Sequence, residues 1–235
     1  VTVENSTING AVEISNGNNS KVALTIGKGT TVSGSLVDGG NGDKVAVTKD
    51  KSVSVAAPNG YKWVDGENGQ TLAKIVMVAE VNGKQYETLQ EAIDAASKNQ
   101  TVKLIADTTE NVTMKTPYLT LDLNGHTLNG GQVKGTPALT VTARVTVKDT
   151  SAEQTGTIMR EDTADNSGVS SHYVIDIQGN GWLTFESGNV TNNSGVVGVK
   201  GASLVRVGDD SVAKYPGLNI KGGSFRQDNF IAIKV

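Results

Sequence analysis

The chain has no cysteine, few aromatic residues and only 4 prolines among its 235 residues. The absence of cysteine excludes disulfide bonds, thiolate metal sites and cysteine catalysis, although it does not identify the cellular compartment. Aromatic residues account for only 4% of the chain. The core must therefore be built mainly from Val, Leu and Ile, which suits a narrow, repetitive interior better than a broad globular one.

Charge and hydropathy exclude two classes of partner. The net charge is −3 and there is no run of basic residues, which argues against nucleic acid and anionic membrane surfaces. No apolar stretch is long enough to span a bilayer, so we expect no membrane insertion. The chain opens in what reads as mid-strand at Val1–Glu4, and it ends in an uncapped strand. We therefore expect a fragment of a longer protein whose leader has been removed.

The clearest local pattern lies at residues 118–128. Three leucines alternate with polar residues between Leu119 and Leu123, which is the period of a strand with one buried face. Asn124-Gly125 follows, and these two residue types tolerate the positive φ of a tight corner. Short apolar pairs of this kind return downstream with no core-forming helix between them. The pattern predicts a solenoid of β-strands.

The downstream repeats can be aligned on Thr140, Asp176 and Gly198, which are separated by 36 and then 22 residues. A turn of about 22 residues accommodates three short strands, with an excursion loop at 150–171. The predicted strands are 138–142, 145–148, 156–158, 174–178, 183–186, 188–190, 196–200, 205–207, 222–225 and 230–235. The predicted inward columns are Leu139, Ile175, Val197 and Ile231 on one sheet, and Val147, Phe185 and Val207 on another.

One helix is predicted near residues 88–97. Thr88 occupies the N-cap position and Glu91 follows three residues later, so the two can form a reciprocal capping box. Apolar residues at helical spacing give the helix one narrow buried face. A helix this short is marginal alone. We expect it to cover the open end of the solenoid, where it would also protect unpaired strand edges.

Residues 1–77 read as a preceding β-rich segment of short strands separated by Gly, Asn and Asp turns. Residues 57–64 look like a closing ribbon. Tyr61 and Trp63 alternate with Lys62, so both rings lie on one face of this ribbon. We expect the two rings to cover one end of the apolar core.

Four segments carry a resemblance to a known family: 81–93, 101–105, 121–128 and 222–225. They resemble the pectate-lyase-like, adhesin-type modules of large surface proteins of Gram-positive gut bacteria, over roughly residues 78–235. The resemblance implies an all-β fold, a right-handed parallel β-helix with a short N-terminal capping helix. Such modules often occur in tandem. It therefore implies a secreted or cell-surface location, neighbouring β-helix units in the same polypeptide, and the end of a preceding unit at 1–77.

No enzyme site can be assembled from the sequence. A lyase on such a fold needs outward carboxylates for calcium and a base, and a glycosidase needs two carboxyls at a set separation. Asp176 has no carboxylate at its matching positions, and Glu186 is expected to pair with Lys148. His126 is expected to bond to backbone at its corner, and it shares no ligand spacing with His172. We predict no catalytic residue, metal site or cofactor.

The sequence analysis therefore favours a non-catalytic, adhesin-like module that binds a host protein, such as a mucin or an immunoglobulin, or a glycan. Four candidate ligand-binding residues form one outward patch of mixed charge: Asp176, Gln178, Lys200 and Arg206. The rings of Tyr173 and Trp182 are further candidates, because carbohydrate binding usually uses exposed rings. Two alternatives stay open. One is a polysaccharide lyase or hydrolase, and the other is a purely structural spacer repeat.

Overall fold

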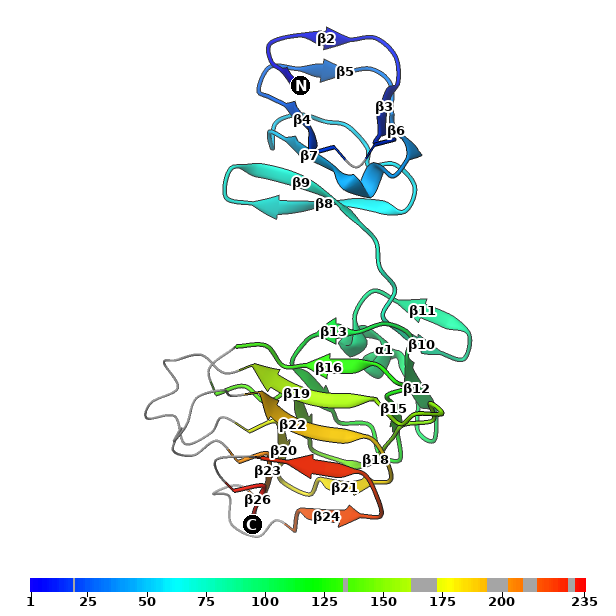
Figure 1. Cartoon of the computed structure of the whole chain (residues 1–235), viewed down its shortest axis with the longest axis vertical. Helices are drawn as coiled ribbons and strands as arrows, with labels where there is room; N and C mark the ends of the chain where they lie inside the picture. Colours follow the sequence, from blue (N-terminus) through cyan, green and yellow to red (C-terminus); the bar gives the residue numbers. More distant parts are fainter. Residues whose placement is uncertain (19, 133–134, 162–172, 194–202, 209–214, 228–230) are drawn as a thin grey trace. The chain divides into compact units, whose positions relative to one another are not determined.

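A computed structural model describes residues 1–18, 20–132, 135–161, 173–193, 203–208, 215–227 and 231–235 (Figure 1). The chain is mostly β-structure with parallel sheets. It divides into two compact units, Val1–Val76 and Met77–Val235. Within the residues described, no helix combines the length and apolar character needed to cross a membrane.

The described residues of the first unit form these strands and one short 3-10 helix: β1 Thr2–Val3, β2 Thr7–Ile8, β3 Val12–Ser15, β4 Val22–Ile26, β5 Thr31–Val32, β6 Leu36–Gly40, η1 Gly42–Lys44, β7 Val45–Lys49, β8 Tyr61–Gly66 and β9 Gly69–Lys74. Strands β1, β4 and β7 pair in parallel, as do β2 with β5 and β3 with β6. Each strand from β1 to β4 therefore pairs with the third strand after it. The β8–β9 hairpin extends the sheet of β1, β4 and β7, because β9 pairs antiparallel to β7.

The hairpin packs over the core of the first unit, as the sequence predicts for its aromatic face. Trp63 contacts this core, and its indole nitrogen donates a hydrogen bond of 2.8 Å to the carbonyl oxygen of Val55. Tyr61 is buried, and its hydroxyl donates to Oδ2 of Asp38 at 2.8 Å. Tyr61 thus ties the hairpin to β6 by a hydrogen bond, whereas Trp63 ties it to the segment before β8 and contacts the apolar core.

The second unit consists of one helix and these strands: β10 Ala79–Val81, β11 Lys84–Tyr86, α1 Leu89–Ala95, β12 Thr101–Leu104, β13 Thr108–Thr109, β14 Val112–Met114, β15 Thr120–Asp122, β16 Thr127–Asn129, β17 Leu139–Val141, β18 Arg144–Lys148, β19 Thr157–Glu161, β20 Ile175–Ile177, β21 Trp182–Phe185, β22 Asn189–Asn193, β23 Val205–Val207, β24 Gly217–Ile220, β25 Ser224–Arg226 and β26 Ile233–Lys234.

These strands form three sheets. The strand orders are β11-β10-β12-β15-β18-β21-β24 in the first sheet, β13-β16-β19-β22-β25 in the second and β14-β17-β20-β23-β26 in the third. From β12 onward every neighbouring pair is parallel, and each strand again pairs with the third strand after it. Strands β10 and β11 add an antiparallel start to the first sheet. The three sheets enclose one core, into which Leu121, Phe185 and Ile175 are fully buried.

The predicted helix is present as α1, and its N-cap is confirmed. The hydroxyl oxygen of Thr88 accepts a hydrogen bond from the amide of Glu91 at 3.2 Å. The amides of Leu89 and Gln90 donate to the carboxylate of Glu110, at 2.8 and 3.2 Å. A long-range partner thus satisfies two more amides of the first turn. Within the described residues, the predicted reciprocal bond from Glu91 to the amide of Thr88 is not formed. The buried face of α1 packs against β10 and β14.

The strand register confirms part of the predicted repeat. The predicted segments 156–158, 188–190 and 222–225 meet in the second sheet, where Ile158 pairs with Val190 and Val190 with Phe225. In the third sheet Leu139 pairs with Ile175, and Thr140 with Asp176. The predicted assignment of the later strands to the first and third sheets is wrong.

The partner of Asp176 is Arg206, 30 residues later, and not Gly198. Val205 therefore follows Ile175 in the inward column, in place of Val197, and Ile233 lies opposite Val205 in place of Ile231. Val207 belongs to the third sheet, so the first sheet continues from Phe185 to Ile220.

The physical reason is that two neighbouring segments, 196–200 and 205–207, both alternate Val with another residue. Either fits the period of a strand, and the chain length between strands does not separate them, because loops in this unit vary in length. The predicted strand at 196–200 lies outside the described residues.

Candidate functional site

An ion pair on the outer side of the third sheet contains two of the predicted binding residues. Asp176 on β20 and Arg206 on β23 are direct partners in the parallel ladder. Nε of Arg206 donates to Oδ1 of Asp176 at 2.7 Å, and Nη2 donates to Oδ2 at 2.6 Å. This bidentate geometry is the strongest form of an Arg–carboxylate pair. The side chain of Asp176 is only 4% exposed and that of Arg206 is 21% exposed.

Two further predicted residues complete this cluster. The guanidinium carbon of Arg206 lies 4.7 Å from the centre of the Tyr173 ring, so the cation is held between a carboxylate and an aromatic face. Nε2 of Gln178 donates to Oδ2 of Asp176 at 2.6 Å. We name these four residues, Tyr173, Asp176, Gln178 and Arg206, the Asp176 cluster. Tyr173 and Asp176 are buried, so only Gln178 and Arg206 offer partly exposed side chains.

The other two predicted binding residues do not join the Asp176 cluster. Trp182 belongs to β21 in the first sheet and is 38% exposed. Its strand neighbours are Arg144 and Gly217. The guanidinium carbon of Arg144 lies 5.4 Å from the ring centre, and a Cβ on Gly217 would lie 2.3 Å from the ring. The ring of Trp182 is therefore packed against its own strand neighbours. Lys200 lies outside the described residues.

The charge arrangement around Asp176 is neutral rather than acidic. Its two ladder neighbours are Thr140 and Arg206. Across the residues described, no group of three or more His, Cys, Asp or Glu side chains is placed to hold a metal ion. Glu186 contacts Lys221, with Nζ and Oε1 3.1 Å apart, where the sequence predicts Lys148 as its partner. The carboxylates named in the sequence analysis thus do not face one another as an acid and base pair.

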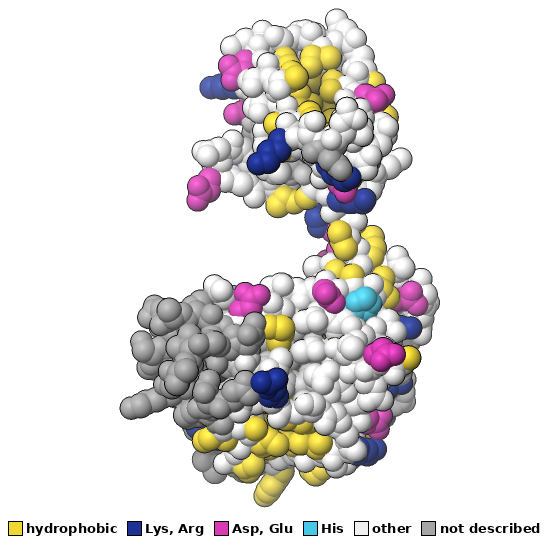
Figure 2. Space-filling view, in the orientation of Figure 1, with side chains coloured by type: hydrophobic (Ala, Val, Ile, Leu, Met, Phe, Trp, Pro, Cys, Tyr) yellow, Lys and Arg dark blue, Asp and Glu magenta, His cyan; other side chains and the backbone are white. Residues whose placement is uncertain are grey.

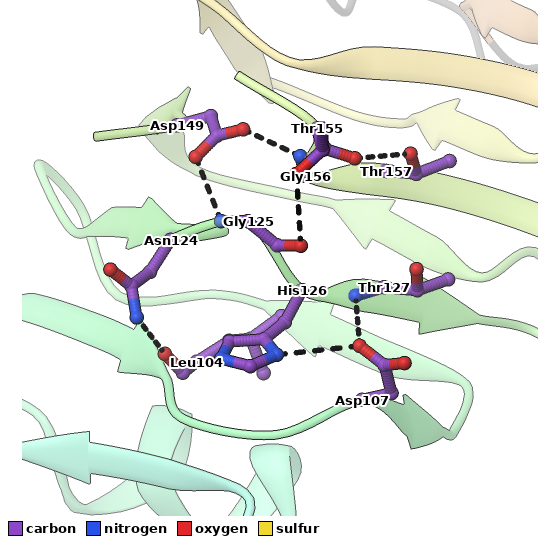
Figure 3. Close-up of polar contacts among 10 residues, drawn as sticks. All are labelled: Leu104, Asp107, Asn124, Gly125, His126, Thr127, Asp149, Thr155, Gly156 and Thr157. Atoms are coloured by element: carbon purple, nitrogen blue, oxygen red, sulfur yellow. Dashed lines mark hydrogen bonds and ion pairs between the residues drawn. The ribbon is translucent and has the colours of Figure 1, made fainter. Parts of the chain in front are cut away.

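The Asn-Gly-His corner between β15 and β16 is built around hydrogen bonds to backbone (Figure 3). Asn124 and Gly125 have φ values of 48° and 81°, the left-handed conformation that the sequence predicts for a corner. The side-chain nitrogen of Asn124 donates to the carbonyl oxygen of Leu104 at 2.9 Å. The corner is thereby fixed to the preceding turn of the chain.

Asp149 holds the same corner from the following turn. Its Oδ1 accepts a hydrogen bond from the amide of Gly125 at 2.9 Å, and its Oδ2 accepts from Gly156 at 2.6 Å (Figure 3). Its Oδ1 also accepts from the amide of Ser151 at 2.9 Å. Burial raises the pKa of the Asp149 carboxyl, but the hydrogen bonds from these amides outweigh it and leave the pKa below its ordinary value. The ionised carboxylate is therefore a structural acceptor.

His126 differs from its prediction. In the part of the chain that the structure describes, its ring makes no hydrogen bond to backbone. Instead, Nδ1 lies 3.4 Å from Oδ1 of Asp107, and the same oxygen accepts the amide of Thr127 at 2.9 Å (Figure 3). Beside this pair lies a hollow of about 240 Å³ on the outer side of the second sheet, lined by Asp107, Thr108, Thr109, Thr127 and Asn129. We name it the Asp107 hollow.

Sequence reasoning missed the Asp107 hollow because its residues come from two turns of the chain. Asp107, Thr108 and Thr109 precede or form β13, whereas Thr127 and Asn129 lie on β16, its ladder partner. The signal that was available is the pair of short polar runs at 107–109 and 127–129, each of which follows a strand of the first sheet.

Comparison with known proteins provides no further identification. No family model matches the chain, and neither a curated protein nor a solved structure is significantly similar to it.

Proposed function

We propose that residues 78–235 form a right-handed parallel β-helix and that the chain is a non-catalytic module of a secreted or cell-surface bacterial protein. The pairing of each strand with the third strand after it, in three sheets around one core, supports the solenoid. Parallel strands joined within one sheet adopt right-handed crossovers in almost all known cases, which supports the hand. Residues 1–77 are then the end of a preceding unit.

The module binds a host protein, such as a mucin or an immunoglobulin, or a glycan, through the outer side of the third sheet. The observation that carries this proposal is the Asp176 cluster. A buried carboxylate and a ring hold Arg206, and the same carboxylate holds Gln178, so two partly exposed polar side chains have fixed positions. Side chains that are already ordered lose little entropy on binding, which favours recognition by a rigid face.

The Asp176 cluster also bears on two other functions, the polysaccharide lyase and the structural spacer. The polysaccharide lyase is disfavoured because Asp176 is bound bidentately by Arg206, which leaves it unsuited to act as a calcium ligand or a base. The structural spacer is favoured by the burial of Tyr173 and Asp176, because a polar cluster satisfied internally also fixes strand register.

The test is binding of the labelled chain to an array of mucins, immunoglobulins, mucin glycans and plant polysaccharides, with and without calcium. We expect saturable, calcium-independent binding to a host protein or glycan. Replacing Gln178 by Ala should weaken that binding, whereas E186Q on the first sheet should leave it unchanged. Calcium-dependent capture of an acidic plant polysaccharide would instead support the lyase function. An array without signal would support the structural spacer.

A further inference from the structure

The Asp107 hollow has walls that are fixed before any ligand arrives. Asp107 is held through Oδ1 by the amide of Thr127 at 2.9 Å. On the opposite strand, the side chain of Asn129 accepts the amide of Gly131 at 2.8 Å and donates to Oε1 of Glu161 at 2.6 Å. The corner behind the hollow is fixed by Asn124 and Asp149, as described above (Figure 3). A site of this kind requires little reorganisation on binding.

Several polar groups in the hollow have no partner in the described part of the chain. No protein group there donates to Oδ2 of Asp107, and the hydroxyls of Thr109 and Thr127 make no hydrogen bond. The side chain of Asp107 is 74% exposed. The hydroxyl of Thr108 donates to Oε1 of Glu110 at 2.6 Å, which leaves its oxygen able to accept. The hollow therefore offers one carboxylate oxygen and several hydroxyls that can both donate and accept.

This set of groups selects among ligand classes. A single carboxylate repels anions, and it falls short of the six to eight oxygen ligands with several carboxylates that calcium prefers. The described residues that line the hollow are one Asp, one Asn and three Thr, which disfavours an apolar ligand. The volume is below the roughly 300–1,000 Å³ of sites for drug-sized molecules, so the ligand is small. A sugar ring satisfies all of these conditions, because its neighbouring hydroxyls can donate to a carboxylate and exchange hydrogen bonds with threonine.

The surface of the second sheet beside the hollow is also polar. Thr127, Thr157, Asn189 and Ser224 lie in register across β16, β19, β22 and β25 and form an uncharged polar column. Much of the surface over β16 and β19 carries neither charged nor apolar side chains (Figure 2). A glycan whose terminal sugar occupies the hollow can therefore continue along the sheet without burying a charge.

We propose that the Asp107 hollow binds a neutral saccharide, with Oδ2 of Asp107 accepting hydrogen bonds from two neighbouring sugar hydroxyls and Thr109 and Thr127 completing the contacts. This site lies on the second sheet and does not depend on the Asp176 cluster. The two proposals can therefore fail separately, since Gln178 and Asp107 are changed in different experiments.

The test is an amide NMR titration of the intact chain with methyl α-mannoside, methyl β-galactoside and methyl β-glucoside, which differ in the orientation of their hydroxyls. The Thr127 amide is the reporter because it bonds directly to Asp107. We expect a saturable shift with at least one sugar. D107N keeps an acceptor for the Thr127 amide but places a donor or a weaker acceptor before the ligand, so affinity should fall about tenfold. T127V removes only the hydroxyl and should also weaken binding.

E186Q removes a carboxylate from the first sheet and serves as the matched control, with affinity unchanged. The proposal is overturned if no sugar shifts the Thr127 amide, or if D107N binds as tightly as the parent chain. It is also overturned if calcium chloride alone shifts this amide while the sugars do not, because the hollow is then a cation site.

Discussion

Residues 1–76 and residues 77–235 pair their parallel strands by the same rule but bury very different amounts of apolar surface. Within the described residues, the core of the first unit contains eight buried apolar side chains, and the core of the second contains 29. Both units also expose apolar side chains on parallel strands: Val22 and Val37 in the first are 39% and 42% exposed, and Ile220 and Ile233 in the second are 40% and 38% exposed. Strand pairing alone therefore does not determine how well a unit is packed.

The first unit compensates with polar contacts around its hairpin. Lys49 is buried, its ammonium donates to the carbonyl oxygen of Val53 at 2.6 Å, and it lies 5.3 Å from the centre of the Trp63 ring. Tyr61 bonds to Asp38 in the same region. Hydrogen bonds contribute less net free energy than the burial of large side chains. We therefore expect the first unit to be the less stable of the two.

The largest expected effect comes from the core of the second unit. Phe185 is fully buried, and its ring packs edge-on against Phe225 with a centroid distance of 4.9 Å. F185A removes this ring and should lower the free energy of unfolding of the second unit by about 3–5 kcal/mol. Urea unfolding followed by Trp182 fluorescence measures it. The urea midpoint reported by Trp63 should be unchanged. An equal shift in the midpoints reported by both tryptophans would contradict the difference between the two units.

The next effect concerns Asp149. D149A leaves the buried amides of the corner without their acceptor, which should cost about 3 kcal/mol. Because the pKa of this carboxyl is lowered on folding, its contribution is present above the unfolded pKa of about 3.9 and is lost as pH falls through the folded value. The Trp182 urea midpoint, measured from pH 7 to pH 3, should fall less in D149A than in the parent.

The first unit should respond instead to alkaline pH. Burial and the hydrogen bond to Asp38 raise the pKa of Tyr61 to about 12. A pKa raised on folding gives stability that is present below the unfolded value of about 10 and is lost as pH rises to the folded value. The Trp63 midpoint should therefore fall between about pH 10 and 12. Y61F should remove this dependence, and a fall that persists in Y61F would refute the assignment to Tyr61.

The smallest effect is expected on the exposed surface of the second unit. Glu186 and Lys221 form an ion pair in which both side chains are substantially exposed. E186Q should change the free energy of unfolding by less than about 1 kcal/mol, because solvent screens such pairs. A loss larger than that of D149A would contradict the ranking of buried over exposed contacts. The same variant is the control in both binding experiments.

The sequence predicts features that depend on local patterns. The N-cap at Thr88, the corner at Asn124-Gly125 and the column Ile158–Val190–Phe225 are all confirmed, because capping residues, left-handed corners and period-2 alternation leave local signals. The predicted sheet and register of Val205–Val207 are wrong because two adjacent Val-rich segments have the same period. Only the three-dimensional register distinguishes them.

The candidate sites were harder to predict, for a related reason. Asp176, Gln178, Arg206 and Tyr173 meet as named, yet the bond between Asp176 and Arg206 depends on the register that the sequence alignment missed. The pairing of His126 with Asp107 joins residues 19 positions apart on different turns of the chain. No local rule places such residues together, since each corner has its own loop length.

The most direct test of the comparison uses the two tryptophans, one in each unit. W182F leaves Trp63 to report on the first unit, and W63F leaves Trp182 to report on the second. Urea unfolding of both variants at neutral pH should give two cooperative transitions, with the Trp63 midpoint at the lower urea concentration. A single coincident transition, or a Trp63 midpoint above that of Trp182, would contradict the account.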